Sequence, residues 1–137
     1  MATGLYCTVP FWRSIEMKWI ILSMCVVACT ADFYAIPKDD HTVDALRRDL
    51  PELKRRLACY IDEGPCSPMA EAYKNIAEDM VLTKCAKCSP ELLELCRAFL
   101  EASREAFPRE YSLLRMKYDP TDSYFDALEN TVGCSRH

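Results

Sequence analysis

The sequence predicts an all-α domain of five to six short amphipathic helices. Apolar residues recur every three or four positions through most of the chain after residue 42, which is the period of a helix with one buried face. Proline follows serine or aspartate at several positions, and this pairing is typical of helix starts. No segment alternates apolar and polar residues for long enough to predict a strand.

Residues 1–31 are predicted to be a secretory signal peptide. The basic residue Lys18 is followed by an apolar run of about 13 residues that ends at Ala31. A run of this length is too short to cross about 30 Å of hydrocarbon as a helix, but it suits a signal peptide. Small residues at Cys29 and Ala31 predict cleavage after Ala31, with Ala35 as the alternative.

Residues 32–137 are then predicted to form a single secreted domain, because their length suits one core. The apolar run could instead be a buried helix, but Asp32 and then Pro37 end it abruptly, which disfavours that interpretation. Residues 1–16 are long for the start of a leader, so Met17 is an alternative translation start.

The first helical pattern runs from about Thr42 to Tyr60 and contains a proline. Its apolar face carries Val43, Leu46, Leu50, Leu53 and Leu57. Pro51 removes a backbone donor and clashes with the preceding turn, so we expect a break near Asp49–Leu50 and two short helices.

Four further helices are predicted from their start signals. Ser67 and Ser89 each precede a proline, as a capping residue precedes the first helical position. The helix after Ser67 runs to about Thr83, and the helix after Ser89 ends at Pro108, which starts another. The pair Asp119-Pro120 is expected to open the last helix. The apolar faces carry Met69, Tyr73, Ile76, Ala77, Met80, Leu92, Leu95, Cys96, Phe99, Ala106, Phe107, Tyr111, Leu114, Tyr118, Tyr124, Phe125 and Leu128.

The composition disfavours several function classes. A net charge of −4 provides no basic surface for a phosphate backbone, so no nucleic-acid partner is expected. The three glycines, Gly4, Gly64 and Gly133, cannot form a glycine-rich phosphate-binding loop. The two histidines, His41 and His137, lie near no cysteine pair. We therefore predict no cofactor, no metal site and no enzymatic activity.

Six cysteines remain after the leader, an even number that predicts disulfides in a small secreted domain. Cys59 and Cys66 flank a turn that brings its ends together. Cys85 and Cys88 are spaced one helical turn apart, within disulfide reach. A zinc site on these four is the alternative, which the six-residue first spacing and an oxidising compartment disfavour. The six are Cys59, Cys66, Cys85, Cys88, Cys96 and Cys134.

The four-cysteine spacing resembles that of insect chemosensory proteins, the OS-D-like family. The pattern Cys59-x6-Cys66-x18-Cys85-x2-Cys88 is that family's hallmark. Similar stretches surround it, namely Val43-Asp44 ahead of Leu53-Lys54, Asp62-Glu63-Gly64-Pro65-Cys66-Ser67-Pro68, Lys84-Cys85-Ala86-Lys87-Cys88-Ser89 and Lys117-Tyr118-Asp119-Pro120. The resemblance covers roughly Phe33 to Leu128.

This resemblance implies a compact bundle of helices around an apolar channel. It also implies two short-range disulfides, Cys59–Cys66 and Cys85–Cys88. The function it implies is to bind and carry long-chain fatty acids, pheromones and odorants in extracellular fluid. The expected partner is therefore a small hydrophobic ligand, with no stable membrane insertion, and the sequence identifies no receptor or dimer partner. A secreted signalling or developmental protein that uses the same bundle as an interaction surface is the alternative.

The sequence departs from the family pattern near the expected channel. Arg56 stands three residues before the first cysteine, where the family commonly has a tyrosine, and Met69-Ala70 replaces an Asp-Gly pair. Tyr111 occupies an aromatic position that is usually tryptophan. Cys96 and Cys134 have no counterpart among the four family cysteines.

The resemblance makes the apolar helix faces candidates for ligand contact, although packed core residues show the same pattern. The candidate contacts are Leu46, Leu53, Leu57, Ile76, Met80, Phe99, Tyr111, Leu114 and Phe125, together with Arg56. Met69 and Met80 are flexible and polarizable, which suits a cavity that accepts several shapes.

Arg56 and Cys96 each allow two interpretations. Arg56 lies on the flank of the apolar face, where it is either a solvated cation or an anchor for a ligand carboxylate. Cys96 lies centrally on its helix face, either as an inert buried thiol or in a third disulfide with Cys134. That bond would close a loop of about 39 residues and contribute up to about 4 kcal/mol by chain entropy.

Overall fold

The structure of the protein is a computed structural model that describes residues 32–38 and 42–134. The predicted leader and the alternative start at Met17 lie outside these described residues. Within them the prediction of an all-α domain is confirmed, since six helices and no strand are present. The helices are α1 (Val43–Arg48), α2 (Leu50–Tyr60), α3 (Pro68–Thr83), α4 (Pro90–Ala106), α5 (Pro108–Tyr118) and α6 (Phe125–Val132).

Polar caps and prolines start the helices where the sequence indicates. The predicted break before Pro51 is confirmed at Asp49, which separates α1 from α2. The Asp49 carboxylate accepts a hydrogen bond of 3.0 Å from the Glu52 amide. Ser67 and Ser89 cap α3 and α4 in the same way, each at 3.2 Å. These side chains satisfy amides that the first turn of a helix leaves without partners.

The last helix begins later than predicted, at Phe125 rather than at Pro120. The cause is Asp119, whose carboxylate accepts from the backbone amides of Ser123, Tyr124 and Phe125 at 2.8–3.0 Å. These bonds hold residues 120–124 in a loop. Burial alone would raise the pKa of Asp119, but the three amide hydrogen bonds outweigh it and lower the pKa.

Both predicted short-range disulfides are confirmed. Cys59–Cys66 joins Cα atoms 4.9 Å apart, and Cys85–Cys88 joins Cα atoms 5.1 Å apart. The second pair lies in the turn between α3 and α4 instead of on a helical turn. The helix has already ended there, because Lys84 and Cys85 both adopt the left-handed backbone conformation. Each bond therefore fixes a connection between consecutive helices and joins no helices that are distant in sequence.

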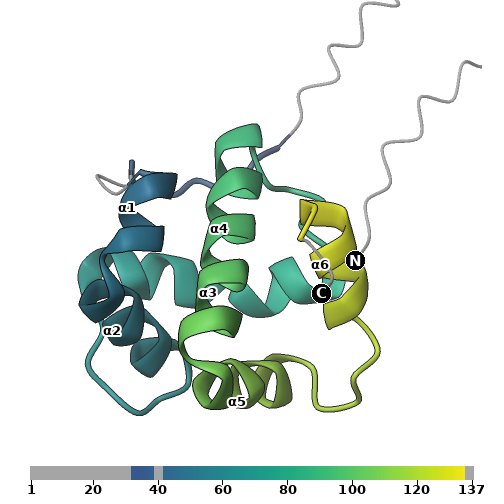
Figure 1. The fold of residues 1–137 in the computed structure, drawn as a ribbon. Coiled ribbons are helices and arrows are strands. Elements are labelled where there is room, and N and C mark those ends of the chain that lie inside the picture. Colours follow the sequence, from purple (N-terminus) through teal and green to yellow (C-terminus); the bar gives the residue numbers. More distant parts are fainter. Residues whose placement is uncertain (1–31, 39–41, 135–137) are drawn as a thin grey trace, which may run out of the picture. The chain divides into compact units, whose positions relative to one another are not determined.

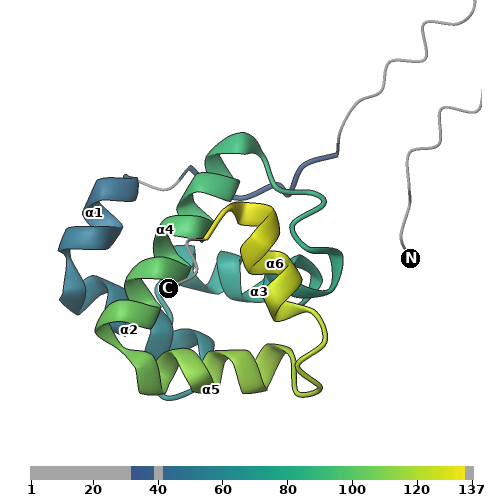
Figure 2. The same cartoon turned by 45° about the vertical axis from the view of Figure 1, so that its right-hand side comes forward.

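Helix α4 is the central element of the bundle, as Figures 1 and 2 show. It packs against α1, α2, α5 and α6, while α3 packs against α2, α5 and α6. Ahead of the first helix, the Tyr34 amide donates to the Lys87 carbonyl at 3.0 Å and the Tyr34 hydroxyl donates to Asp79 at 2.5 Å. In the part of the chain that the structure describes, no helix has the length and apolar character needed to span a membrane.

Candidate ligand-binding cavity

The bundle contains a partly open apolar cavity of about 90 Å³. Every helix contributes to its wall, from α1 at one end of the sequence to α6 at the other. Most of the lining side chains are aliphatic or aromatic, and the one charged residue among them is Arg56. The lining residues are Leu46, Arg56, Tyr60, Tyr73, Ala77, Met80, Val81, Leu92, Leu95, Cys96, Phe99, Leu100, Leu114, Tyr118, Phe125 and Leu128.

Aromatic contacts hold one wall of the cavity in place. The Tyr60 and Phe99 rings meet edge to face with centroids 5.4 Å apart, which joins α2 to α4. The Tyr118 hydroxyl donates to the Tyr60 backbone carbonyl at 3.0 Å, which joins α5 to the end of α2. This wall therefore combines a flat apolar surface with hydrogen bonds at its edge.

An ion-pair cluster lies beside that wall. The Lys117 ammonium donates to the Tyr60 carbonyl at 2.7 Å and also to the Asp62 carboxylate. Lys74 of α3 donates to the same carboxylate at 2.6 Å. Hydrogen bonds from the two lysines lower the pKa of Asp62 to about 2. The cluster connects α3 and α5 to the loop after α2 through exposed groups, which salt and solvent weaken.

Arg56 lies in the cavity wall, and its interpretation as a solvated cation is wrong. The residue is only 5% exposed. Its Nε donates to Glu52 at 3.0 Å, while the guanidinium lies 6.0 Å from the centre of the Tyr73 ring. The other oxygen of the Glu52 carboxylate accepts from Arg55 at 2.7 Å. Burial raises the pKa of Glu52, but the hydrogen bonds from Arg56 and Arg55 exceed this effect and the net pKa is lowered.

The structure brings together part of the predicted contact set. Leu46, Met80, Phe99, Leu114 and Phe125 line the cavity, as does Arg56. These residues come from every helix of the bundle, so the helical period places them on inward faces. Their contact with a ligand stays a prediction.

The other predicted contacts do not line the cavity. Leu53 and Leu57 are fully buried, and Ile76 is packed against the core. The Tyr111 hydroxyl donates to the buried Glu129 carboxylate, and its ring meets Phe125 edge to face at 6.0 Å. A helix inside a bundle buries a wide apolar face, and only part of that face borders the cavity. The rest packs against neighbouring helices.

Ten lining residues are absent from the predicted contact set, and most carry a visible sequence signal. Seven of them, Tyr73, Ala77, Leu92, Leu95, Cys96, Tyr118 and Leu128, lie on the apolar faces read from the sequence. The other three, Tyr60, Val81 and Leu100, fall at helical spacing from these faces. Whether these residues border the cavity, rather than Leu53 or Ile76, depends on how each helix is rotated about its own axis. Helical periodicity in the sequence does not determine that rotation.

Comparison with known proteins identifies the family. A family model described as the insect pheromone-binding family A10/OS-D matches residues 34–126. The chain belongs to the OS-D family. Among relatives of this OS-D protein, ejaculatory bulb-specific protein 3 of Drosophila melanogaster is 27% identical over 116 residues, covering 85% of this chain and 91% of the relative. Allergen Tha p 1 of Thaumetopoea pityocampa is 26% identical over 123 residues, covering 85% and 95%. Membership of a pheromone-binding family supports a carrier role.

Proposed function

We propose that this OS-D protein is a secreted, non-catalytic carrier that holds a small hydrophobic ligand, such as a fatty acid, pheromone or odorant, between its six helices. The observation that carries the proposal is the apolar cavity to which every helix contributes. Secretion rests on the predicted leader, and N-terminal sequencing of the mature protein tests cleavage after Ala31.

The volume of the cavity limits the size of the ligand that the bundle can hold without movement of its helices. Ligand sites usually enclose about 300–1,000 Å³, and an apolar cavity of about 150 Å³ admits benzene. A cavity of about 90 Å³ is smaller than both. A long alkyl chain therefore requires the helices to separate. The two disulfides permit this movement, because each spans only the connection between consecutive helices.

Burial of an alkyl chain supplies the free energy that opposes the cost of separating the helices. A 16-carbon chain gains about 0.8 kcal/mol per buried CH₂, on the order of 10 kcal/mol in total. Part of this gain is lost because binding restricts the motion of the ligand. Another part is lost because the separated helices give up contacts with one another. A net binding free energy near −8 kcal/mol corresponds to about 1 μM affinity.

Arg56 supports preference for a ligand with a carboxylate. Arg56 is the one charged side chain that lines the cavity, and it is only 5% exposed. A ligand carboxylate in the cavity would accept charge-assisted hydrogen bonds from the Arg56 guanidinium, and such bonds are stronger than those to a neutral ester. We therefore infer that acids bind more tightly than the corresponding esters.

Displacement of a fluorescent fatty acid tests the carrier function. Saturable uptake of one probe per chain, reversed by an unlabelled fatty acid, is the expected result. Absence of saturable uptake would overturn the proposal and favour the alternative of a bundle that acts only through its surface.

The role of Arg56 is tested with a matched pair of variants. Arg56→Gln removes the buried charge, whereas Arg55→Gln removes a charge that bonds to the same Glu52 but is 73% exposed. We expect Arg56→Gln to weaken a fatty acid about tenfold or more and to leave its methyl ester nearly unchanged. Arg55→Gln should change neither ligand. Equal losses for acid and ester would contradict the anchor.

A further inference from the structure

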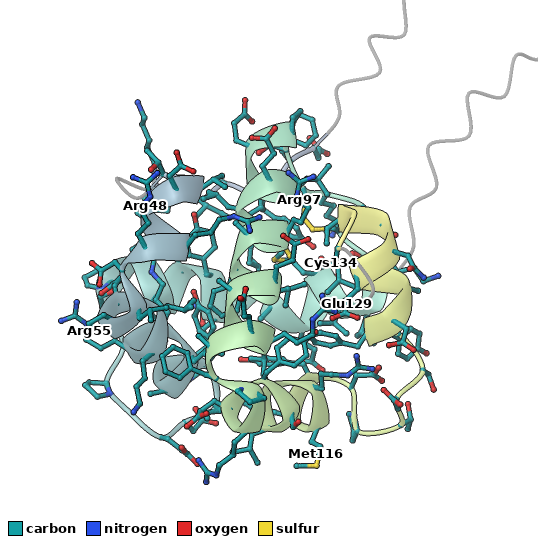
Figure 3. The ribbon with its side chains drawn as sticks, viewed as in Figure 1. Arg48, Arg55, Arg97, Met116, Glu129 and Cys134 are labelled. Atoms are coloured by element: carbon teal, nitrogen blue, oxygen red, sulfur yellow. A yellow bond between two sulfur atoms is a disulfide. The ribbon has the colours of Figure 1, made fainter. Side chains whose placement is uncertain are left out.

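Cys96 and Cys134 lie where α4 meets the end of α6. Both pack against the hydrophobic core, and both are free thiols in the structure. A Cβ atom placed on Gly133 would lie 3.8 Å from Cδ of Arg97. Because Gly133 directly precedes Cys134 and Arg97 directly follows Cys96, the two cysteines are adjacent to a close contact between the helices. Figure 3 shows Arg97 and Cys134 on this side of the molecule.

The backbone after α6 directs Cys134 back toward the bundle. Gly133 adopts the left-handed conformation, with φ of 83°, and ends the helix. The Cys134 amide then donates to the Glu129 carbonyl at 2.9 Å. This pairing is the usual way in which a helix end folds back on its last turn. Cys134 is therefore held against the last turn of α6 by backbone hydrogen bonds that do not involve its thiol.

The electrostatic surroundings of the two thiols agree with this proximity. Burial raises the pKa of Cys96 to about 12, and the neighbouring Cys134 adds to the rise. Burial also raises the pKa of Cys134, to about 11, with Glu129 and Glu101 contributing. Negative charge on the Cys134 thiolate therefore disfavours ionisation of the Cys96 thiol.

We propose that Cys96 and Cys134 form a third disulfide, which fastens the end of α6 to the cavity wall on α4. The oxidant is a disulfide of the surrounding medium, such as oxidised glutathione. The Cys134 thiolate attacks one sulfur of that disulfide and releases the first thiol. The Cys96 thiolate then attacks the Cys134 sulfur and releases the second. Two protein thiols lose two electrons and two protons, and the oxidant becomes two thiols.

The bond would restrict how the cavity opens, a consequence that rests on the proposed carrier function. Cys96 lines the cavity on α4, and Phe125 and Leu128 line it on α6. A covalent link between these helices prevents them from separating at this point. Enlargement for a long ligand then depends on movement of α1, α2, α3 and α5.

Mass mapping tests the bond independently of any ligand. The mature protein, residues 32–137, is equilibrated with oxidised and reduced glutathione, alkylated in denaturant without reductant and digested with trypsin. Trypsin leaves Cys88 and Cys96 on one peptide, residues 88–97. A third disulfide therefore predicts one species that links this peptide to residues 85–87 and 118–136. Alkylation of both Cys96 and Cys134 would overturn the proposal.

Single and double variants provide a second test. Cys96→Ala, Cys134→Ala and the double variant all remove the same bond, so each should lower the Tm of the oxidised protein by about 10 °C or more. The double variant should lose no more than a few degrees beyond either single variant. Small, additive losses would contradict the bond. Faster release of a bound fluorescent fatty acid from Cys134→Ala is expected, and an unchanged rate would overturn the restriction on opening.

Discussion

Shortening a side chain in the cavity wall should improve ligand binding while it weakens the fold. Leu114 of α5 lines the cavity and is 5% exposed, whereas Leu57 of α2 is fully buried and does not line it. Leu114→Ala and Leu57→Ala delete the same three carbon atoms from buried positions. The two variants therefore differ mainly in whether the emptied space joins the cavity.

The expected magnitudes follow from the deleted carbons. Three carbons at about 0.8 kcal/mol each give about 2.4 kcal/mol of lost transfer free energy. The space left behind raises the total destabilisation to about 3–5 kcal/mol. For a domain of this size, such a loss lowers Tm by on the order of 15 °C. Without ligand, the two variants should show similar losses.

The stabilisation that a bound ligand provides should differ between the two variants. A fatty acid at 100 times its Kd stabilises a protein by about 2.7 kcal/mol. In Leu114→Ala the alkyl chain can fill the deleted volume, so up to about 2 kcal/mol of additional ligand stabilisation is expected, equivalent to about 30-fold tighter binding. Leu57→Ala should show the same ligand-induced stabilisation as the wild type.

Thermal unfolding with and without a 16-carbon fatty acid provides the assay, and fluorescence displacement gives the affinities. The ligand-induced rise in Tm should be largest for Leu114→Ala. An equal rise in both variants would refute the reasoning, because the ligand would then not occupy the space beside Leu114. A larger rise in Leu57→Ala would place the ligand elsewhere.

Three further substitutions test contacts that stabilise the bundle. Tyr111→Phe removes the hydrogen bond to the buried Glu129 and should lower the free energy of unfolding in urea by about 1–3 kcal/mol; an unchanged midpoint would contradict this. The pKa of Glu52 is lowered from its ordinary value of 4.5, so its contribution to stability is present above that value and is lost as the pH falls through the folded-state pKa. Glu52→Gln should therefore reduce Tm at neutral pH and flatten its fall below about pH 5, whereas a parallel acid profile would refute the assignment. Asp119→Ala should speed amide hydrogen exchange at the start of α6, near Phe125, and unchanged exchange there would show that the cap is dispensable.

The sequence predicts features that depend on neighbours along the chain. Pro51 ends one helix and starts another because it lacks an amide donor. Ser67 and Ser89 cap the helices that follow them through bonds that span three residues. The family resemblance extends this local information to the disulfide pairing, since each bond connects cysteines only a few positions apart.

Features that depend on contacts between distant segments are harder to predict. The sequence does not predict the start of α6 at Phe125, because a proline after Asp119 indicates a helix start, whereas the Asp119 carboxylate bonds to amides further along the chain. The sequence also offers a solvated Arg56 as one alternative, because an isolated charge at the edge of an apolar face is usually solvated. Its burial depends on packing around α2 and on the pairing with Glu52.

The helical character of residues 43–132, most of the helix starts and the buried helix faces follow from the sequence alone. The packing of the six helices is needed to show that Leu114 borders a cavity while Leu57 and Tyr111 pack elsewhere. Helical periodicity relates each side chain only to the axis of its own helix. A cavity is instead defined by the rotation and separation of several helices, and these quantities follow from the combined packing of all their side chains.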